Sequence, residues 1–149
     1  GVITLLLDIA TGFFAVWFAA RLTGVNTLWT SAAALAVMAG HAYPVFLKFH
    51  GGKAVASFVG AFTFLAPVPM AAVALVFIGV VAVTRFISLG SILGAGTFPL
   101  AVWLILHPPW PLLAASIVAG AFIVYRHRSN LERLHRGSEH VFSFGGRKA

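Results

Sequence analysis

Cysteine is absent from the sequence, and acidic side chains are nearly so: only three Asp and Glu residues occur among 149. Without cysteine the chain can form no disulfide, no thiol nucleophile and no cysteine-ligated metal site. Charged residues of either sign make up only 9%, whereas soluble domains carry about a quarter. This scarcity excludes a soluble enzyme, a disordered chain and a collagen-like fibre.

Hydrophobic residues make up 60% of the chain, and the mean hydropathy is +1.00. One water-facing domain of this length cannot bury so many apolar side chains. The sequence therefore predicts an all-α protein, a polytopic integral membrane helix bundle. Ten Lys and Arg residues give a net charge of +7, which in a membrane protein indicates affinity for anionic headgroups or phosphorylated substrates. Membrane lipid is therefore an expected partner, and nucleic acid is not.

Polar residues, prolines and glycines divide the chain into six apolar segments, at 2–21, 28–42, 54–66, 69–84, 88–106 and 110–125. Several are shorter than the roughly 20 residues that span a bilayer, and their Gly, Ala and Ser content suits close helix packing. Residues 54–84 are divided in two because Pro67 and Pro69 disfavour a continuous helix. The sequence predicts six transmembrane helices.

The basic residues predict how these helices are oriented. Lys48 and Lys53 precede the third segment, and an arginine-rich tail begins at Arg126. The positive-inside rule places both groups in the cytoplasm, which requires an even number of crossings between them, as six helices provide. Residue 1, Arg85 and the C-terminus then lie inside. The outside holds the turns at 22–27, Pro67–Pro69 and 107–110, with Trp29 at the membrane interface.

Two polar clusters fall on the predicted cytoplasmic side. The first ends in Gly51, Gly52 and Lys53 at the start of an apolar helix. Glycines allow backbone N–H groups to face an anion, and the helix N-terminus and the lysine add positive charge, so the cluster fits phosphate binding. It is not a Walker A loop, because Leu47 replaces its first glycine and Ala54 replaces its Ser or Thr. A flexible loop with a snorkelling lysine is the alternative interpretation.

The second cluster runs from Arg126 to Glu139. If the last apolar helix continues beyond the membrane, His127 and Asn130 share a face, with Arg126 and Arg133 nearby. Such side chains suit a phosphate or a polyol hydroxyl, but a basic segment that binds anionic lipid is an equal alternative. Glu139 is expected to pair with an arginine in a structural role.

Three further polar features remain open on sequence alone. Asp8 lies within the first apolar segment, where capping or hydrogen bonds inside the bundle are as plausible as a function. Ser88 follows Arg85 at the start of the fifth segment and is expected either to cap that helix or to line a site. No His-x-x-x-x-Asp motif occurs, and the nearest arrangement is His127 with Glu132.

Three segments resemble motifs of the bacterial acyl-phosphate:glycerol-3-phosphate acyltransferases, the PlsY family. They follow one another in the family's order and at its spacing over nearly the whole chain. The matching residues are Gly40, His41, Pro44, Phe46, Phe49 and 51–57 for the second motif, 85–92 for a segment between motifs, and 127–139 for the third motif.

The sequence also departs from the family pattern. A first motif and its preceding helix, which would make a seventh crossing, would come before residue 1, and the start without Met suggests truncation. We therefore expect residues 1–149 to form a single transmembrane acyltransferase domain that lacks its N-terminal helix and first motif, and with them part of the family's active site. Ala54 replaces the family's usual glycine, and Thr11 replaces a lysine.

The resemblance implies transfer of a fatty acyl group from acyl phosphate to the 1-hydroxyl of glycerol 3-phosphate, giving lysophosphatidate and phosphate. It implies a monomeric, multi-pass enzyme of the bacterial inner membrane whose active site faces the cytoplasm. No metal or cofactor is implied. The expected site consists of His127, Asn130 and Lys53 as catalytic residues, Gly51, Gly52, Lys53, Ser88 and Arg128 as phosphate-binding residues, and Glu139 as a structural residue.

Two other functions are weighed against this one. A transporter or channel for a small phosphorylated solute would explain the basic cytoplasmic side, but it predicts ionisable residues deep in the spans. Only Asp8, near one end of its segment, is of that kind. A lipid-binding scaffold without catalytic activity would need the basic tail but not Gly51, Gly52 and Lys53.

Overall fold

The structure is a computed structural model that describes residues 1–49 and 51–143, and all regular elements of this part of the chain are helical. Six apolar helices follow one another along the chain, and a short polar helix completes the series. Their bounds are α1 Val2–Thr23, α2 Thr27–Ala42, α3 Val55–Leu65, α4 Pro67–Thr84, α5 Ile87–Leu106, α6 Trp110–Arg126 and α7 Arg128–His135, with a 3₁₀ turn, η1, at Val45–Leu47.

The six apolar helices coincide with the six predicted segments to within a few residues, which confirms the all-α class. The third and fourth segments separate at a single residue, Ala66, rather than across a longer hairpin. Pro67 opens α4, where the missing N–H of proline costs no hydrogen bond, and the α4 backbone begins with Met70 N–H donating to Ala66 O at 2.9 Å.

The helices differ in their ability to cross a bilayer. Four segments are long and apolar enough to do so: α1, Thr27–Leu47, α4 and α5. A fifth is added if α6 and α7, which are bent by 53° relative to each other, count as one span. Helix α3 has 11 residues and rises only about 16 Å, well below the roughly 30 Å hydrocarbon core. The number of crossings therefore stays a prediction.

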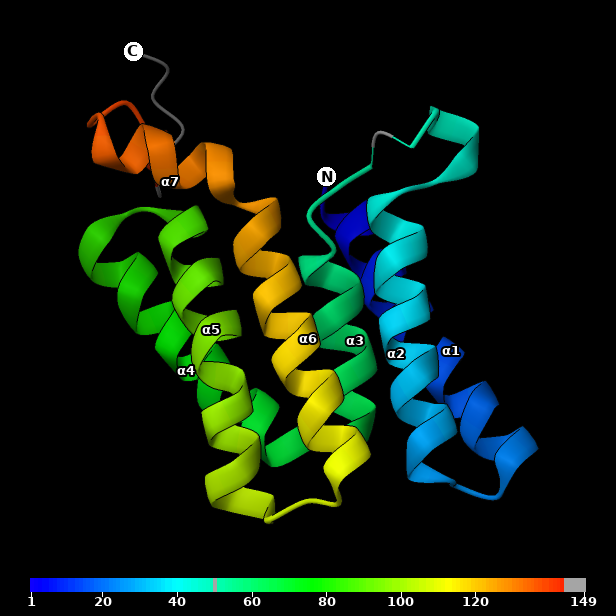
Figure 1. Ribbon diagram of the computed structural model, residues 1–149. Helices are drawn as coiled ribbons and strands as arrows, with labels where there is room; N and C mark the ends of the chain where they lie inside the picture. The colour runs from blue at the N-terminus through cyan, green and yellow to red at the C-terminus, as the bar shows by residue number, and fades with distance from the viewer. Residues whose placement is uncertain (50, 144–149) are drawn as a thin grey trace.

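The helices form one bundle, in which α3 and α6 lie between the α1–α2 pair and the α4–α5 pair (Figure 1). Glycines allow α1 and α3 to approach each other closely. A Cβ atom on Gly12 would collide with the backbone O of Ser57, and one on Gly60 would collide with the backbone O of Ile9. This reciprocal contact fixes α3, and with it the loop that carries Lys53, against α1.

Aromatic rings fill the centre of the bundle. Phe58 and Phe62 of α3 meet Phe98 of α5, with ring centroids 5.0 Å apart in both pairs. The edge-to-face arrangement is the favourable one for such rings. It connects α3 to α5 directly, so the starts of these two helices, which both carry predicted site residues, are held in register.

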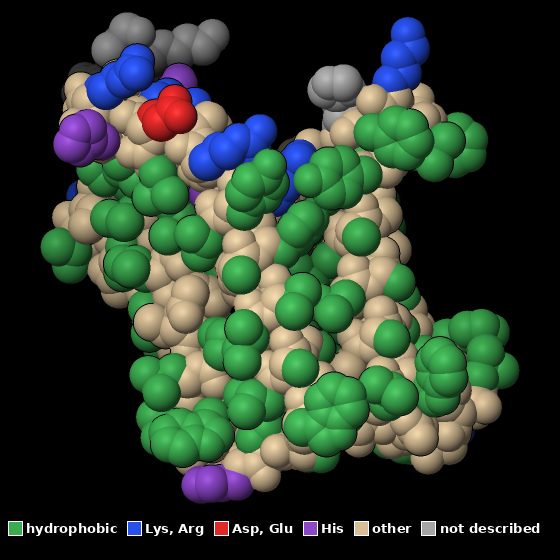
Figure 2. All heavy atoms as spheres, in the orientation of Figure 1, with side chains coloured by type: hydrophobic (Ala, Val, Ile, Leu, Met, Phe, Trp, Pro, Cys, Tyr) green, Lys and Arg blue, Asp and Glu red, His purple; other side chains and the backbone are tan. Residues whose placement is uncertain are grey.

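The two ends of the bundle differ in chemistry. One end, here called the basic end, holds seven basic residues of the described chain: Lys48, Lys53, Arg85, Arg126, Arg128, Arg133 and Arg136 (Figure 2). Gly1 and α7 also lie at this end (Figure 1). The turns after α1, α3 and α5 lie at the opposite end. Each of the four tryptophans lies within two helical turns of the turn after α1 or the turn after α5. This is the grouping of loops that the charge pattern predicts.

Candidate active site

The two predicted polar clusters meet at the basic end in one hydrogen-bonded chain. Lys53 Nζ donates to Asn130 Oδ1 at 2.6 Å, although the two residues are 77 positions apart. Asn130 Nδ2 in turn donates to Glu139 Oε1 at 2.6 Å, and Arg133 Nε donates to Glu139 Oε2 at 2.7 Å. Lys53, Asn130, Glu139 and Arg133 are thus connected through consecutive side chains. This assembly is here called the Lys53–Arg133 chain.

A bend at the end of α6 positions the second cluster. The helix does not continue straight past the last apolar segment: α6 ends at Arg126, and α7 departs at 53°. The N–H of Asn130 donates to the His127 carbonyl at 2.9 Å across this bend. Both side chains turn inward as a result, with His127 2% and Asn130 4% exposed.

The hydrogen bonding of His127 defines which of its ring nitrogens is available. Nδ1 lies 2.8 Å from the Ile123 carbonyl, which only accepts hydrogen bonds, so we assign the proton of the neutral ring to Nδ1. Nε2 is then an acceptor. Burial lowers the pKa of His127, partly offset by the hydrogen bond to Ile123, and this favours the neutral ring.

Arg126 holds the glycine loop in place. Its Nη2 donates to the carbonyl oxygens of Gly51 at 3.1 Å and Gly52 at 2.9 Å, and its guanidinium lies over the Tyr43 ring, 4.8 Å from the centroid. The Gly51 N–H donates to the Ala42 carbonyl at 3.1 Å. The expectation that Gly51 offers this N–H to an anion therefore does not fit the structure.

The reason for a glycine at position 51 is steric. A Cβ atom there would collide with the His41 carbonyl and Pro44 Cδ, and would lie 2.7 Å from the Ala42 carbonyl. A Cβ on Gly52 would lie 3.0 Å from His41 Nε2. The loop must therefore pass very close to the end of α2, and only glycine allows it.

His41 connects the glycine loop to α1, a contact that the sequence analysis missed. Its Nδ1 lies 3.8 Å from Asp8 Oδ1, so the one acidic residue of the apolar segments faces the bundle beside the site. The sequence does contain a signal for this contact. Asp8 and His41 are ionisable residues within two separate apolar segments, and such residues usually face the bundle interior. Sequence alone could not show that these two share one contact.

Ser88 lies beside Glu139 and does not cap α5. The capping residue is Phe86, whose N–H donates to Thr84 Oγ1 at 3.2 Å, so the capping interpretation was wrong. The Ser88 hydroxyl is buried and close enough to contribute to the low pKa of Glu139, although its Oγ does not reach full hydrogen-bonding geometry. Ser88 therefore brings the start of α5 to the site.

Arg128 is the predicted site residue that the structure places elsewhere. Its side chain is exposed, and its guanidinium lies over the Tyr125 ring at 4.8 Å from the centroid. Arg126 and Arg133 enter the site instead, whereas the sequence analysis placed them only nearby. Arg128 points away from the site because the bend at His127 reorients α7 relative to α6.

The site gathers more positive than negative charge. Burial raises the pKa of Glu139, but hydrogen bonds from Asn130 and Arg133, the nearby Ser88 hydroxyl and the Arg133 charge outweigh burial and lower the pKa to about 2. Burial and the charges of Arg133 and Arg126 lower the pKa of Lys53, against the opposite effect of Glu139. Arg126 and Arg133 thus both act on Lys53, and Glu139 supplies a carboxylate to this group of three cations, an arrangement that an incoming phosphate would stabilise.

Known proteins are similar to this chain in sequence and in fold. The family model described as "Glycerol-3-phosphate acyltransferase" matches residues 1–137. The protein of that name from Desulforamulus reducens is 40% identical over 149 residues, covering 99% of this chain and 72% of its own. The one from Geobacter sulfurreducens is 39% identical over 142 residues, covering 95% and 72%.

Two crystal structures of PlsY (YgiH), an integral membrane glycerol 3-phosphate acyltransferase, have the same fold. One is the lysophosphatidic acid form and the other the glycerol 3-phosphate form. Each superimposes with a TM-score of 0.89 at 35% identity over 95% of this chain, covering 72% and 70% of the PlsY chains. This similarity confirms the predicted multi-pass membrane helix bundle.

Proposed function

Because this chain belongs to the glycerol-3-phosphate acyltransferase family, as the motif resemblance predicts, we propose that it transfers a fatty acyl group from acyl phosphate to the 1-hydroxyl of glycerol 3-phosphate. The products are lysophosphatidate and inorganic phosphate, and the reaction belongs to phospholipid biosynthesis. The acceptor and product forms of the PlsY structures support these two ligands. The observation that carries the proposal is the Lys53–Arg133 chain, which joins both motifs at one end of the bundle.

Lys53 and Asn130 are proposed to hold the phosphate of glycerol 3-phosphate. The Lys53 ammonium has two further N–H groups beyond the one that it donates to Asn130, and these can bind phosphate oxygens. Gly52, which precedes Lys53, and Ser88, which lies beside Glu139, are proposed to contribute to the same phosphate site. Glu139 is structural: by accepting from Asn130 and Arg133 it fixes the amide that orients Lys53.

His127 is proposed to orient the attacking hydroxyl. With Nδ1–H directed to the Ile123 carbonyl, Nε2 can accept a hydrogen bond from the 1-hydroxyl of glycerol 3-phosphate. The hydroxyl oxygen attacks the carbonyl carbon of acyl phosphate. The bond between this carbon and the bridging oxygen of the phosphate breaks, and the hydroxyl proton leaves with the phosphate. Acyl phosphate is already activated, so positioning and charge stabilisation suffice and no cofactor is needed.

The location of the enzyme is proposed from its charge. Seven basic residues of the described chain lie at the basic end and Arg21 lies toward the other, which supports a site facing the cytoplasm from the bacterial inner membrane. We take residues 1–149 as one transmembrane domain that acts as a monomer. A sedimentation or light-scattering measurement in detergent checks the monomer.

The test is acyl transfer by the purified protein in lipid nanodiscs. Palmitoyl phosphate and radiolabelled glycerol 3-phosphate are supplied together, and lysophosphatidate and released phosphate are both measured. Equal amounts of the two products, dependent on both substrates, are expected. Phosphate release without glycerol 3-phosphate, or no lysophosphatidate, would contradict the proposed reaction. Uptake of labelled glycerol 3-phosphate into sealed vesicles without acylation would indicate a transporter instead.

A further inference from the structure

An apolar loop extends from the bundle between α2 and the glycine loop. This segment, residues 43–49, is here called the aromatic loop and contains the η1 turn. Phe46 is 98% exposed, and Val45, Leu47 and Phe49 are exposed as well. Phe46 and Phe49 are among the residues that resemble the second family motif, yet the proposed function gives them no role. The loop therefore presents apolar side chains that the proposed reaction does not explain.

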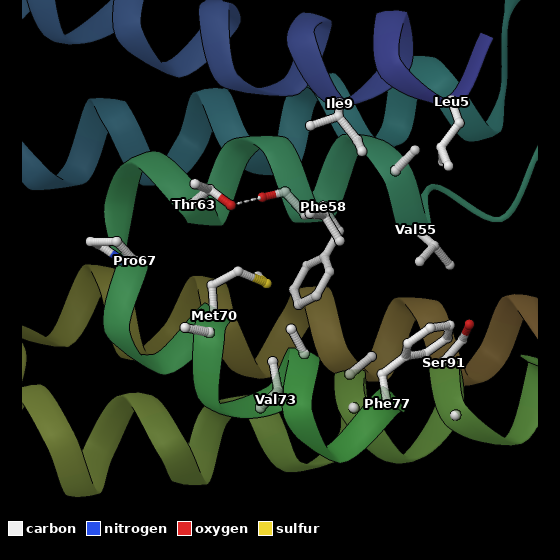
Figure 3. A pocket seen from close by; sticks show the side chains of 17 residues that line it. Leu5, Ile9, Val55, Phe58, Thr63, Pro67, Met70, Val73, Phe77 and Ser91 are labelled. Carbon is white, nitrogen blue, oxygen red and sulfur yellow. Dashed lines mark hydrogen bonds between the residues drawn. The ribbon is translucent and has the colours of Figure 1, made fainter. Parts of the chain in front are cut away.

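The interior of the bundle does not receive these side chains. An apolar cavity of about 500 Å³ lies between α1, α3, α4 and α5, with Phe58 and Met70 among its lining residues (Figure 3). No residue of the aromatic loop lines this cavity, and none belongs to the buried core of the described chain. Any apolar partner of the loop must therefore lie outside the protein.

The backbone of the aromatic loop is hydrogen-bonded within itself. The N–H groups of Leu47 and Phe49 donate to the Pro44 carbonyl at 3.1 and 3.0 Å, and the Lys48 N–H donates to the Val45 carbonyl at 3.1 Å. A backbone donor that enters lipid unpaired costs several kcal/mol in general, so internal pairing is a condition for insertion. These three consecutive N–H groups meet that condition.

The loop also keeps a strained conformation. Lys48 and Phe49 have φ angles of 49° and 63°, in the left-handed region that residues other than glycine rarely adopt. At the start of the loop, the Tyr43 ring contacts the Phe122 ring and lies beneath the Arg126 guanidinium. Strained backbone persists where the surrounding structure enforces it, and it is concentrated at functional sites. The outward position of the apolar side chains is therefore imposed by the fold.

The position of the loop indicates what covers it. Thr27–Leu47, which contains α2 and η1, is long and apolar enough to span a membrane, and Lys48 ends this apolar run. The hydrophobic side chains of the loop extend sideways from the bundle at the level of the basic end, and a basic side chain points beyond them (Figure 2). Aromatic and apolar side chains beside a basic one are typical of segments in the membrane–water interface.

We propose that the aromatic loop inserts Phe46 and Phe49 into the lipid leaflet at the basic end, at the boundary between headgroups and acyl chains. Lipid rather than a protein is the partner because the loop continues a segment with the length and hydropathy of a membrane span. Since the loop leads into Gly51 and Lys53, its insertion holds the glycine loop at the membrane surface. The inference goes beyond the proposed reaction and does not depend on it.

A depth measurement tests the insertion. A nitroxide is attached at Phe46→Cys in lipid nanodiscs of phosphatidylethanolamine and phosphatidylglycerol, and its collisions with oxygen and with a water-soluble nickel chelate are measured. Leu75→Cys, exposed on α4, is the reference for hydrocarbon, and Ser138→Cys is the reference for water. Nickel accessibility at position 46 should be at least about threefold lower than at position 138. Equal nickel accessibility at these two positions would overturn the proposal.

The contribution of the two aromatic side chains is tested with a neighbouring reporter. The nitroxide is attached at Leu47→Cys, and Phe46 and Phe49 are both replaced, either by serine or by leucine. The serine pair should raise nickel accessibility to the value at Ser138, and the leucine pair should keep it low because leucine retains apolar area. The Leu75 label, unchanged in both pairs, shows that the bundle is intact. A reporter that stays at the same depth in the serine pair contradicts anchoring by the aromatic side chains.

A matched control and two further outcomes complete the test. Val141→Ser changes an exposed apolar residue outside the loop and should leave the depth of the Leu47 reporter unchanged. Low accessibility of the Phe46 label to both oxygen and nickel would show that a protein surface covers the loop, which refutes insertion into lipid. Acyl transfer is measured on the same samples. Insertion without acyl transfer would refute the proposed reaction and leave the assignment of the aromatic loop in place.

Discussion

Lys53 is the single charge on which the phosphate-binding proposal depends most. Replacing it by alanine removes a charge-assisted contact worth about 2 kcal/mol. At 1.36 kcal/mol per decade, kcat/KM for glycerol 3-phosphate should fall roughly 30-fold. Lys48→Ala removes a loop lysine outside the Lys53–Arg133 chain and serves as the control. Normal insertion with unchanged kinetics in Lys53→Ala would make Lys53 a membrane-interface anchor.

Glu139 makes the assembled site sensitive to acid. Its pKa is lowered to about 2 from the ordinary 4.5. A carboxyl with a depressed pKa stabilises the fold fully above its unfolded-state pKa, and this contribution is lost as pH falls through the folded value. The melting temperature of the wild type should therefore fall between about pH 4.5 and pH 2.

The Glu139→Gln variant tests that assignment. Glutamine keeps an acceptor for Asn130 but has no charge and cannot titrate. The melting temperature of the variant should therefore be lower than that of the wild type at neutral pH, and it should fall less in acid. Glu132→Gln changes an exposed acid and should follow the wild type. An acid-induced drop of the same size in Glu139→Gln would assign the titration to another group.

Ala54 adopts a backbone conformation that suits glycine. Its φ of 59° lies in the left-handed region, where a Cβ atom costs about 1–2 kcal/mol. Ala54→Gly removes this strain and adds an unfolded-state entropy cost of about 0.5–1 kcal/mol, for a net stabilisation of up to about 1.5 kcal/mol. A raised melting temperature is expected. Ala56→Gly, inside α3, should lower the melting temperature. A lower melting temperature in both variants would contradict backbone strain at Ala54.

At the scale of elements, the stability of the bundle depends on the close contact between α1 and α3. A Cβ on Gly60 meets the backbone of Ile9, which cannot move aside as a flexible side chain can. Gly60→Ala should therefore destabilise the protein by about 1–3 kcal/mol, measured as a lower melting temperature in detergent. It should also displace Lys53 and lower activity in the protein that remains folded.

Gly79 provides the matched comparison, because a Cβ there meets nothing within 4 Å. Gly79→Ala lies within α4 and should stabilise that helix by up to about 1 kcal/mol. The two substitutions are chemically identical and differ only in the neighbouring backbone. Equal effects at the two positions would show that helix contact does not govern the stability of α1 and α3.

The whole molecule is polarised, with the basic end opposite the tryptophan-rich end, and this sets its expected orientation. The chain lacks cysteine, so single-cysteine variants can be labelled without background. Val68 is 60% exposed at the start of α4. Val68→Cys should react with an impermeant thiol reagent added to intact bacteria, and Ser138→Cys, at the basic end, only after the cells are opened. The reverse pattern would invert the orientation, and labelling of both only in opened cells would contradict six crossings.

The sequence by itself determined the class of the protein, the bounds of its helices and the grouping of its loops at two ends. These are local properties: apolar length, proline positions such as Pro67, and the placement of basic residues are encoded in consecutive residues. The match of two long motifs also identified the family, because residues such as Lys53 and Asn130 occur in a fixed order whatever the packing.

Only the tertiary structure decided which of these residues meet. Helices that are apolar on every side carry no periodicity that indicates which face turns inward. Sequence therefore could not predict that Arg126 and Arg133 rather than Arg128 reach the site, because the bend at His127 makes that choice. The cavity between four helices likewise exists only through their close approach, since its walls come from segments far apart in the chain.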